Sequence, residues 1–453
     1  MSLRSSVAAG VGHLSQSILH GIFNRGSSLP GLVALKLDPD ILYHYKDRYD
    51  FVIVGGTNGK TTATALAVHA LKQKYPDVLY NPTGSNMKRG IATIFVTAPK
   101  PKKKGLAVLE VDEANIVRIV KYFKPKAFVF TNLFRDQLDR YSELYATWDR
   151  MLEGVRMAPQ ATIIANADDP IFNSVDLPNP RVWYGFNDQP MGDLEAPSNT
   201  DGVVCPKCHH IIHYGFITYG GLGAYFCPNC GHKRPQLDYE VTAVERMTSA
   251  DSVVKFDDSE FKIPVGGAYN IYNALAAYSL ARFMGVESSA IKTAFAQSPE
   301  IFGRQEKVKI GDKEMVKIGD KEMVIIMVKN QIGVDTVLDM IKTDKDPFSF
   351  AFLLTALPAD GEDTSWIWDC NFEILKDHDI PYYLVGAANY KDAATRFKFG
   401  GFKDVNVEPN PEKVIDRIKE IPTKRMYVVT CYTAMRQLRK ALAEQKLIDG
   451  GME

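Results

Sequence analysis

The chain has 453 residues, of which 45% are hydrophobic and 24% charged, and a chain of this length usually folds as two or three domains. Lys and Arg total 54, as do Asp and Glu, so the overall charge favours neither nucleic acid nor an anionic membrane as a partner. The sequence has no run of about 18 apolar residues, which argues against a helix that spans a membrane.

The N-terminal segment, residues 1–23, has an early arginine and several apolar residues, but Ser, His and Gln interrupt the apolar stretch. A signal peptide needs a continuous apolar core. We therefore expect this segment to form the first helix of a cytoplasmic protein.

Short β-rich runs alternate with helical segments from residue 50 to residue 165. This alternation is typical of a doubly wound α/β fold with a parallel sheet. Functional loops lie at the C-terminal ends of the strands in such a sheet. Polar segments follow the predicted strands at GGTNGK (55–60), EVDEAN (110–115), TNLFRDQLD (131–139) and NADDP (166–170).

The segment VGGTNGKTT, residues 54–62, predicts a loop that binds nucleotide phosphates. It has the Gly-Lys-Thr order of a P-loop, but Val54 stands where the usual pattern has its first glycine. The N–H groups that open the next helix would face the phosphates. Lys60 would neutralise phosphate charge, and Thr61 would offer its hydroxyl to magnesium. A chance lysine after a glycine-rich turn does not explain this order. The predicted nucleotide contacts are Gly56, Thr57, Asn58, Gly59, Lys60, Thr61 and Thr62.

Four of the six cysteines predict a zinc ribbon within an insertion at about 200–235. Cys205 and Cys208 form one C-x-x-C pair, and Cys227 and Cys230 form another. Two such knuckles supply four thiolates to one zinc ion and leave no open position for water, so the expected role is structural. Nucleic-acid binding is the alternative, but no basic and aromatic residues interleave here. The other two cysteines are interpreted as small buried hydrophobes.

A second α/β pattern runs from about residue 305 to the end of the chain. We place a domain boundary near residue 303, which gives an ATP-binding domain at 1–303 and a C-terminal α/β domain at 304–453. The octapeptide VKIGDKEM at 308–315 recurs unchanged at 316–323. Each copy predicts two short strand arms around a Gly-Asp turn, and we assign the repeat no function.

The segment ADGEDTSWIWDCNFE, residues 359–373, gathers carboxylates around two tryptophans after a predicted strand. A carboxylate cluster at a strand end is a candidate site. Ordinary roles fit equally well, because Asp360-Gly361 suits a turn and Asp363 suits a helix cap. The residues alone leave both interpretations open.

The short loop GTNGKTT is similar to the ATP loop of the Mur ligase superfamily, which includes cell-wall peptide ligases and folylpolyglutamate synthases. Further matches follow in the family's order. Glu110 in LEVDEAN resembles the magnesium-binding Glu, Asn270 lies in GAYNIYNALAA, and Arg304 lies in FGRQE, where it would reach the nucleotide. The resemblance implies ATP and Mg²⁺ as cofactors, with the magnesium ion held by Thr61 and Glu110.

Two positions depart from the superfamily pattern. Gln137 stands where the family has a metal-binding His, and the sequence MLEG at 151–154 covers the place where many members carry a carbamylated lysine. The resemblance therefore supplies no ligand for a second metal ion.

The four-cysteine insertion and the segment D-G-x-D-x-S-W-I-W-D extend the likeness to nearly the whole chain, which resembles the MurT family of ligase subunits of lipid II isoglutaminyl synthases. This resemblance implies ATP-dependent amidation of the α-carboxylate of D-glutamate in the lipid II stem peptide, through an acyl phosphate, during peptidoglycan biosynthesis. Lys60 and Glu110 would support phosphoryl transfer. The expected place is the cytoplasm, at the inner face of the membrane.

The same resemblance implies a partner. A GatD-like glutaminase subunit would supply ammonia within a heterodimer, and an Asp of the ligase subunit would complete its Cys-His pair. We assign this role first to Asp363 and second to Asp360. The alternatives are a folylpolyglutamate-like ligase that adds an amino acid, and a zinc-ribbon interaction or nucleic-acid module whose ATP site is structural.

Overall fold

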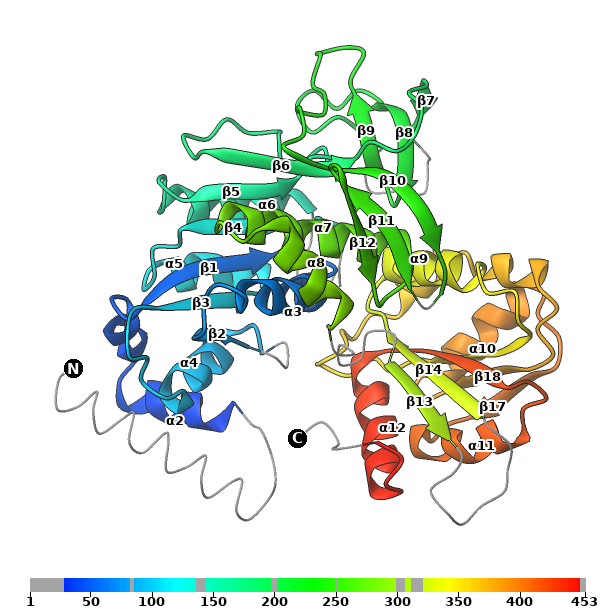
Figure 1. Cartoon of the computed structure of the whole chain (residues 1–453). Coiled ribbons are helices and arrows are strands. Elements are labelled where there is room, and N and C mark those ends of the chain that lie inside the picture. Colours follow the sequence, from blue (N-terminus) through cyan, green and yellow to red (C-terminus); the bar gives the residue numbers. More distant parts are fainter. Residues whose placement is uncertain are drawn as a thin grey trace.

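The computed structural model describes residues 28–81, 85–135, 144–196, 203–249, 251–298, 306–310 and 321–448. The predicted N-terminal helix, Gln137, Arg304 and the boundary proposed near residue 303 lie outside these ranges. The described part of the chain contains two large sheets and one small sheet, and helices pack against the two large sheets (Figure 1). Within this part, no helix has both the length and the apolar character needed to cross a membrane.

The larger sheet has nine strands in the order β12-β11-β10-β6-β5-β4-β1-β3-β2. The strands from β10 to β2 pair in parallel, which confirms the parallel α/β sheet predicted for this region. β11 and β12 add an antiparallel edge that the prediction did not include. The strands are β1 (Tyr49–Gly55), β2 (Val78–Tyr80), β3 (Gly105–Glu110), β4 (Ala127–Phe130), β5 (Thr162–Asn166), β6 (Arg181–Phe186), β10 (Tyr239–Met247), β11 (Ser252–Phe256) and β12 (Ser259–Ile263).

Strand β1 illustrates why helices must cover both faces of this sheet. Val52 and Val54 belong to one hydrophobic cluster, and Phe51 and Ile53 belong to another, because successive strand residues point to opposite faces. The first cluster includes α3 (Lys60–Leu71), α7 (Ala268–Phe283) and α8 (Ser288–Ala296). The second includes α2 (Leu29–Leu37), η1 (Ile41–Tyr45), α4 (Lys88–Thr97), α5 (Ile116–Val120) and α6 (Leu144–Arg156).

The second large sheet belongs to the C-terminal part of the chain and has the order β13-β14-β18-β15-β16-β17. All its strand pairs are parallel except β13 with β14. The strands are β13 (Glu306–Ile310), β14 (Lys321–Met327), β15 (Phe348–Leu353), β16 (Tyr383–Gly386), β17 (Val405–Glu408) and β18 (Arg425–Thr430).

Helices cover both faces of this sheet as well. One face packs against α9 (Gln331–Ile341), η3 (Ser365–Trp368), η4 (Phe372–Asp377) and α10 (Tyr390–Phe399). The other packs against α11 (Val414–Glu420), which follows η5 (Pro411–Lys413), and α12 (Tyr432–Glu444). The predicted C-terminal α/β pattern is therefore present.

The duplicated octapeptide pairs differently from the prediction. Val308 of the first copy lies opposite Met323 of the second, in the antiparallel pair of β13 and β14. The described arms therefore pair between the copies rather than within one copy. Residues 311–320, which include both Gly-Asp pairs at which turns are predicted, lie outside the described residues.

The four-cysteine insertion supplies β8 (His213–Tyr219) and β9 (Leu222–Phe226) of the small antiparallel sheet, and β7 (Leu194–Glu195), just before the insertion, completes it. It stands beside β6 and β10 at the upper edge of Figure 1. Ile212, Tyr214 and Tyr225 form a small buried cluster of its own, whereas Phe216, Leu222 and Ala224 of β8 and β9 belong to the large cluster that contains α3 and α7. So small an apolar core is typical of an element that needs further support.

The two α/β parts of the chain meet near the phosphate loop. The Asn58 side-chain amide donates to Asn330 Oδ1 at 3.4 Å, and the Tyr269 hydroxyl donates to Met340 Sδ at 3.8 Å. Ile332, at the start of α9, belongs to the same hydrophobic cluster as Val54. The junction therefore brings the N-terminal end of α9 against the loop.

Candidate active site

Four predicted loops meet at one edge of the nine-stranded sheet. Strands β5, β4, β1 and β3 are consecutive neighbours and all run in parallel. The segments that follow them therefore leave the sheet at the same edge, which is where α/β folds place their ligands. This arrangement confirms the clustering predicted from the alternation of strands and helices.

The phosphate loop depends on two glycines with positive φ. Gly56 has φ 125° and Gly59 has φ 83°, values that L-residues with a side chain rarely adopt. A Cβ atom at Gly56 would lie 2.3 Å from Thr131 Oγ1, and one at Gly59 would lie 1.9 Å from Asn273 Oδ1. The loop is therefore packed closely against its neighbours, and α3 begins directly after it without a side-chain cap. The first backbone N–H groups of α3 are therefore placed to bind an anion.

Val54 lies in the sheet, before the loop begins. It is 1% exposed and pairs with Glu110 on one side and Val129 on the other. The loop proper therefore starts after Gly55, which explains why the glycine of the longer pattern is absent.

Thr131 and Asn132, which follow β4, hold the phosphate loop through hydrogen bonds to Asn58. The Asn58 N–H donates to Asn132 Oδ1 at 2.9 Å, and Asn132 Nδ2 donates to the Asn58 carbonyl at 3.1 Å. The Thr131 hydroxyl donates to the same carbonyl at 2.7 Å. The sequence pattern indicates the TNLF motif but predicts no role for these side chains.

Lys60 is buried and already has acceptors in this structure. Its Nζ donates to the carbonyls of Gly56 and Thr57 and to Glu113 Oε1, the last at 2.7 Å. Burial lowers the pKa of Lys60, but the carboxylates of Glu113 and Glu110 outweigh burial and raise it. Burial raises the pKa of Glu113, and Lys60 opposes that shift without cancelling it. Glu113 was not predicted, although it lies in the EVDEAN motif.

Glu110 has a free carboxylate oxygen that fits a metal ion. The side chain is 3% exposed. Its backbone N–H donates to Asn81 Oδ1 at 2.9 Å, and Asn86 Nδ2 donates to its Oε1 at 3.2 Å. Oε2 is buried and has no hydrogen-bond partner among the described residues. A buried oxygen of this kind costs free energy unless it finds a partner, and Mg²⁺ prefers oxygen ligands. Glu110 therefore fits a magnesium ion, and the hydroxyl of Thr61, at the start of α3, is half-buried.

Three asparagines lie near the loop, and only one of them was predicted. Asn270 is 1% exposed, donates to the Gly266 carbonyl at 2.8 Å and accepts from Asn273 at 3.4 Å, so its amide holds the start of α7. Asn273 contacts Gly59 as described above. Asn330 caps α9 by accepting from the Gly333 N–H at 2.9 Å. Its buried Nδ2 has no partner among the described residues and is a donor available to a ligand.

The segment 151–154, expected to lack a carbamylated lysine, lies in α6, where Glu153 is exposed and the other three residues are buried. Met151 and Leu152 are 0% and 1% exposed, and Gly154 approaches the backbone of Val117. Met151, Leu152 and Gly154 pack in the core and offer no metal ligand.

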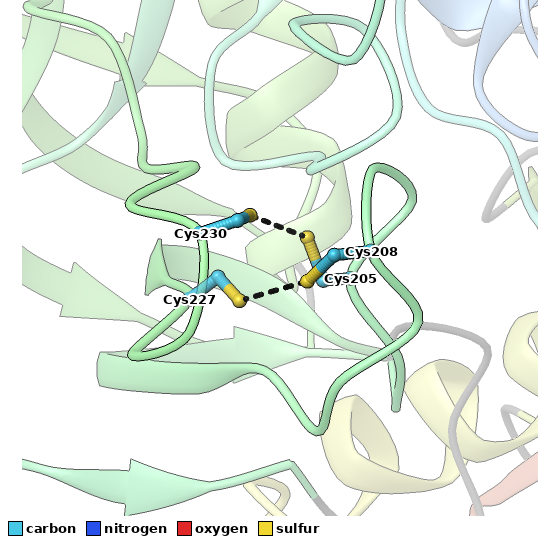
Figure 2. Close-up of side chains that lie close together, drawn as sticks. All are labelled: Cys205, Cys208, Cys227 and Cys230. Atoms are coloured by element: carbon cyan, nitrogen blue, oxygen red, sulfur yellow. Dashed lines mark hydrogen bonds between the residues drawn. The ribbon is translucent and has the colours of Figure 1, made fainter.

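The four predicted cysteines converge between two facing knuckles, as Figure 2 shows. Cys205 Sγ lies 3.6 Å from Cys230 Sγ, and Cys208 Sγ lies 3.5 Å from Cys227 Sγ. All four sulfur atoms lie within 4.8 Å of one another. A zinc ion at about 2.3 Å from each of four thiolates would separate the sulfurs by roughly 3.8 Å. The donor set and its size therefore fit one tetrahedral zinc ion.

The C-terminal carboxylates occupy two different environments. Asp360 is 8% exposed, and it accepts from the Thr433 N–H at 2.8 Å, in the first turn of α12. Asp363 accepts from the N–H and the hydroxyl of Ser365, both at 2.8 Å, where η3 begins. Asp360 thus supports a buried helix terminus, whereas Asp363 is more accessible and has only local partners.

The sequence and the fold resemble known ligases. Residues 54–205 match the Mur ligase middle domain family, and residues 327–435 match the MurT ligase C-terminal family. The MurT subunit of lipid II isoglutaminyl synthase (glutamine-hydrolyzing) from Streptococcus pneumoniae is 43% identical over 99% of each chain. The subunit of that name from Staphylococcus aureus strain COL is 32% identical over 87% of this chain and 88% of the relative.

A solved structure with this architecture is that of a pseudomurein peptide ligase type C from Methanothermus fervidus. It superposes with a TM-score of 0.66, covers 90% of this chain and 81% of its own, and is 20% identical. Likeness at this level of identity establishes the shared fold.

Proposed function

Because the chain belongs to the MurT family of lipid II isoglutaminyl synthase subunits, we propose that it catalyses the ATP-dependent amidation step of that enzyme. The substrate is the α-carboxylate of D-glutamate in the lipid II stem peptide, and the product is D-isoglutamine. The observation that carries this proposal is the buried edge at which the phosphate loop, Lys60 and the unpartnered oxygen of Glu110 come together.

The first step is phosphoryl transfer. A carboxylate oxygen of D-glutamate attacks the γ-phosphorus of ATP, the bond to the β-phosphate oxygen breaks, and ADP leaves. The N–H groups at the start of α3 bind the phosphates. Lys60 exchanges Glu113 for the phosphoryl oxygens and offsets their developing charge. A magnesium ion held by Thr61 and Glu110 would further neutralise the phosphates.

In the second step ammonia attacks the acyl carbon of the resulting acyl phosphate. The C–N bond forms, the C–O bond to phosphate breaks, and the nitrogen loses a proton, which gives the amide and inorganic phosphate. Activation is needed because a carboxylate is a poor electrophile. Arg304, carried over from the family pattern, would contact the nucleotide, and Asn330 offers a second donor from the C-terminal part of the chain.

The ammonia is proposed to come from a GatD-like glutaminase that forms a heterodimer with this chain. Cys370 and Cys431 are both buried, and burial raises both thiol pKa values, which disfavours a thiolate nucleophile. Asp363 is proposed to complete the partner's Cys-His pair, because its carboxylate is accessible and bonded only to Ser365. Asp360 is the less suitable candidate, because α12 uses its carboxylate.

A zinc ion is proposed for the four cysteines, with a structural role. Thiolate ligands would shield the metal on all sides and hold the two knuckles together. The enzyme is proposed to work in the cytoplasm at the inner face of the membrane, where a lipid-linked substrate is reached.

The test combines this chain, a GatD-like glutaminase, ATP, glutamine and lipid II, followed by mass spectrometry of the stem peptide. Conversion of the α-carboxylate to an amide lowers the mass by about 1 Da, and we expect it to depend on ATP. Transfer of an amino acid instead would favour the folylpolyglutamate-like alternative. An unchanged stem peptide in the presence of an active glutaminase would refute the proposal.

A further inference from the structure

The NADDP turn, residues 166–170, lies between the four-cysteine insertion and the phosphate loop. Its Asp168 side chain is completely buried. The carboxylate accepts from Arg234 Nη1 at 2.9 Å, from the Tyr272 hydroxyl at 2.7 Å and from the Phe186 N–H at 2.7 Å. Tyr272 belongs to α7 and Arg234 follows the second cysteine knuckle, so Asp168 joins the insertion to the ATP-binding part of the chain.

The insertion contacts this turn at three points. Besides the ion pair, Gly223 of β9 donates its N–H to the Asp168 carbonyl at 3.0 Å. His232 Nε2 lies 2.9 Å from the Pro170 carbonyl. The Arg234 guanidinium also lies 5.4 Å from the centre of the Phe216 ring, on β8, so this arginine is held by both the insertion and the turn.

The other side of the turn supports the phosphate loop. Asp169 Oδ2 accepts from the Leu133 N–H at 2.8 Å. The neighbours of Leu133 bond directly to the loop: Asn132 pairs with Asn58, and Phe134 exchanges two 3.0 Å hydrogen bonds with the Thr57 hydroxyl. Hydrogen bonds, joined by the backbone between Asp168 and Asp169 and on either side of Leu133, therefore connect the insertion through the turn to the phosphate loop.

We infer that Asp168 and Arg234 are positioning residues for the nucleotide, through which the four-cysteine insertion holds the phosphate loop in its binding geometry. The inference rests on the proposed function, because it takes residues 56–62 as the ATP site. Neither side chain needs to touch the nucleotide. The insertion then stabilises the ATP site and does not act as an independent interaction module.

The buried ion pair of Asp168 and Arg234 favours one defined position of the turn. Burial raises the pKa of Asp168, and the Arg234 guanidinium opposes that shift. Loss of the cation leaves a fully buried carboxylate without its charge partner, which is strongly unfavourable. The turn must then shift to admit water or a proton, and Asp169 shifts with it because the two residues are adjacent.

The test is the Arg234→Met variant of the full chain, assayed with its glutaminase partner. Calorimetric titration with Mg²⁺ and a non-hydrolysable ATP analogue is expected to give about tenfold weaker binding than the unmodified chain. The KM for ATP should rise by a similar factor, while kcat at saturating ATP changes by less than about twofold. Arg234→Lys, which retains the charge, should recover part of the affinity.

The matched control is Arg246→Met. Arg246, in β10 of the nine-stranded sheet, forms an ion pair with Asp251 through two hydrogen bonds, at 2.9 and 2.7 Å, but its side chain is 49% exposed. We expect the Arg246→Met variant to bind the nucleotide as tightly as the unmodified chain. If Arg234→Met fails to fold, Tyr272→Phe removes only the hydroxyl that donates to Asp168 and should weaken nucleotide binding in the same direction, to a smaller extent.

Two results would overturn the inference. Nucleotide affinity within twofold of the unmodified chain in Arg234→Met, or in Tyr272→Phe where the first variant does not fold, would mean that the contacts only hold the insertion in place. In that case the proposed function stands, because the unmodified chain still binds ATP. If the unmodified chain itself binds no nucleotide, both the proposed function and the inference are wrong.

Discussion

Substitution of Asp360 and Asp363 should separate a structural carboxylate from a catalytic one. Asp360 is buried and accepts from the Thr433 N–H in the first turn of α12. Removal of such a helix N-terminal acceptor costs about 0.5–2 kcal/mol, and loss of a negative charge at this end of the helix adds about 0.3–1 kcal/mol. The Asp360→Ala variant should therefore lose about 1–3 kcal/mol of unfolding free energy.

Asp363 should behave in the opposite way. Its two hydrogen bonds go to Ser365 at an accessible position, where water replaces them, so Asp363→Ala should lose no more than about 1 kcal/mol. The proposed contact with the glutaminase predicts a large loss of glutamine-dependent amidation, on the order of 10²–10⁴-fold by analogy with the acidic member of a catalytic triad. Amidation driven by added ammonium chloride should persist, because the ATP site is untouched.

The assay measures both activities and thermal unfolding for each variant in the heterodimer. Asp369→Ala is the control, since Asp369 is exposed in the same segment and should leave both activities and stability unchanged. Equal loss of glutamine-driven and ammonium-driven activity in Asp363→Ala would refute the assignment. A selective loss of glutamine-driven activity in Asp360→Ala, with stability retained, would transfer the role to Asp360.

Three further predictions concern other parts of the chain. Lys60→Met should abolish turnover and destabilise the fold by about 3–5 kcal/mol, because it leaves buried Glu113 without its cation; the double variant with Glu113→Gln should regain stability but no activity, as measured by denaturant unfolding and ATP turnover. Burial raises the pKa of Asp335 to about 6, so the native state binds its proton more tightly than the unfolded chain. The contribution of Asp335 to the free energy of unfolding is then fully present below about pH 4 and is lost as the pH rises through about 6. In Asp335→Asn, melting curves measured over this pH range should no longer show the fall in stability. Removal of metal by a chelator should release one zinc ion per chain and make the insertion sensitive to protease, since a structural zinc site contributes on the order of 10–16 kcal/mol to folding; an intact insertion after complete removal would contradict the structural role.

The two carboxylates mark the limit of prediction from sequence. The segment 359–373 predicts a candidate site, yet its residues fit turns and caps equally well. In the structure Gly361 has the positive φ of a turn, and Asp363 accepts from Ser365 just before η3, whose N-cap is Thr364. The difference between Asp360 and Asp363 depends on Thr433, which lies 73 residues away. Nothing in the local sequence marks that contact.

The sequence by itself determined the features that neighbouring residues encode. Alternation of strands and helices predicted the parallel sheet, the order Gly-Lys-Thr predicted the phosphate loop, and the cysteine spacing predicted a four-thiolate cluster, since periodicity and ligand spacing are local properties of a chain. The antiparallel edge of β11 and β12, the pairing of the duplicated octapeptide between copies, and the roles of Glu113, Asn132 and Asn330 were decided by the tertiary structure. These depend on which strands become neighbours and which loops then meet, and that order arises from packing between distant segments. The same reason applies to the insertion: its cysteines were readable from their spacing, but only the fold joins it to the phosphate loop.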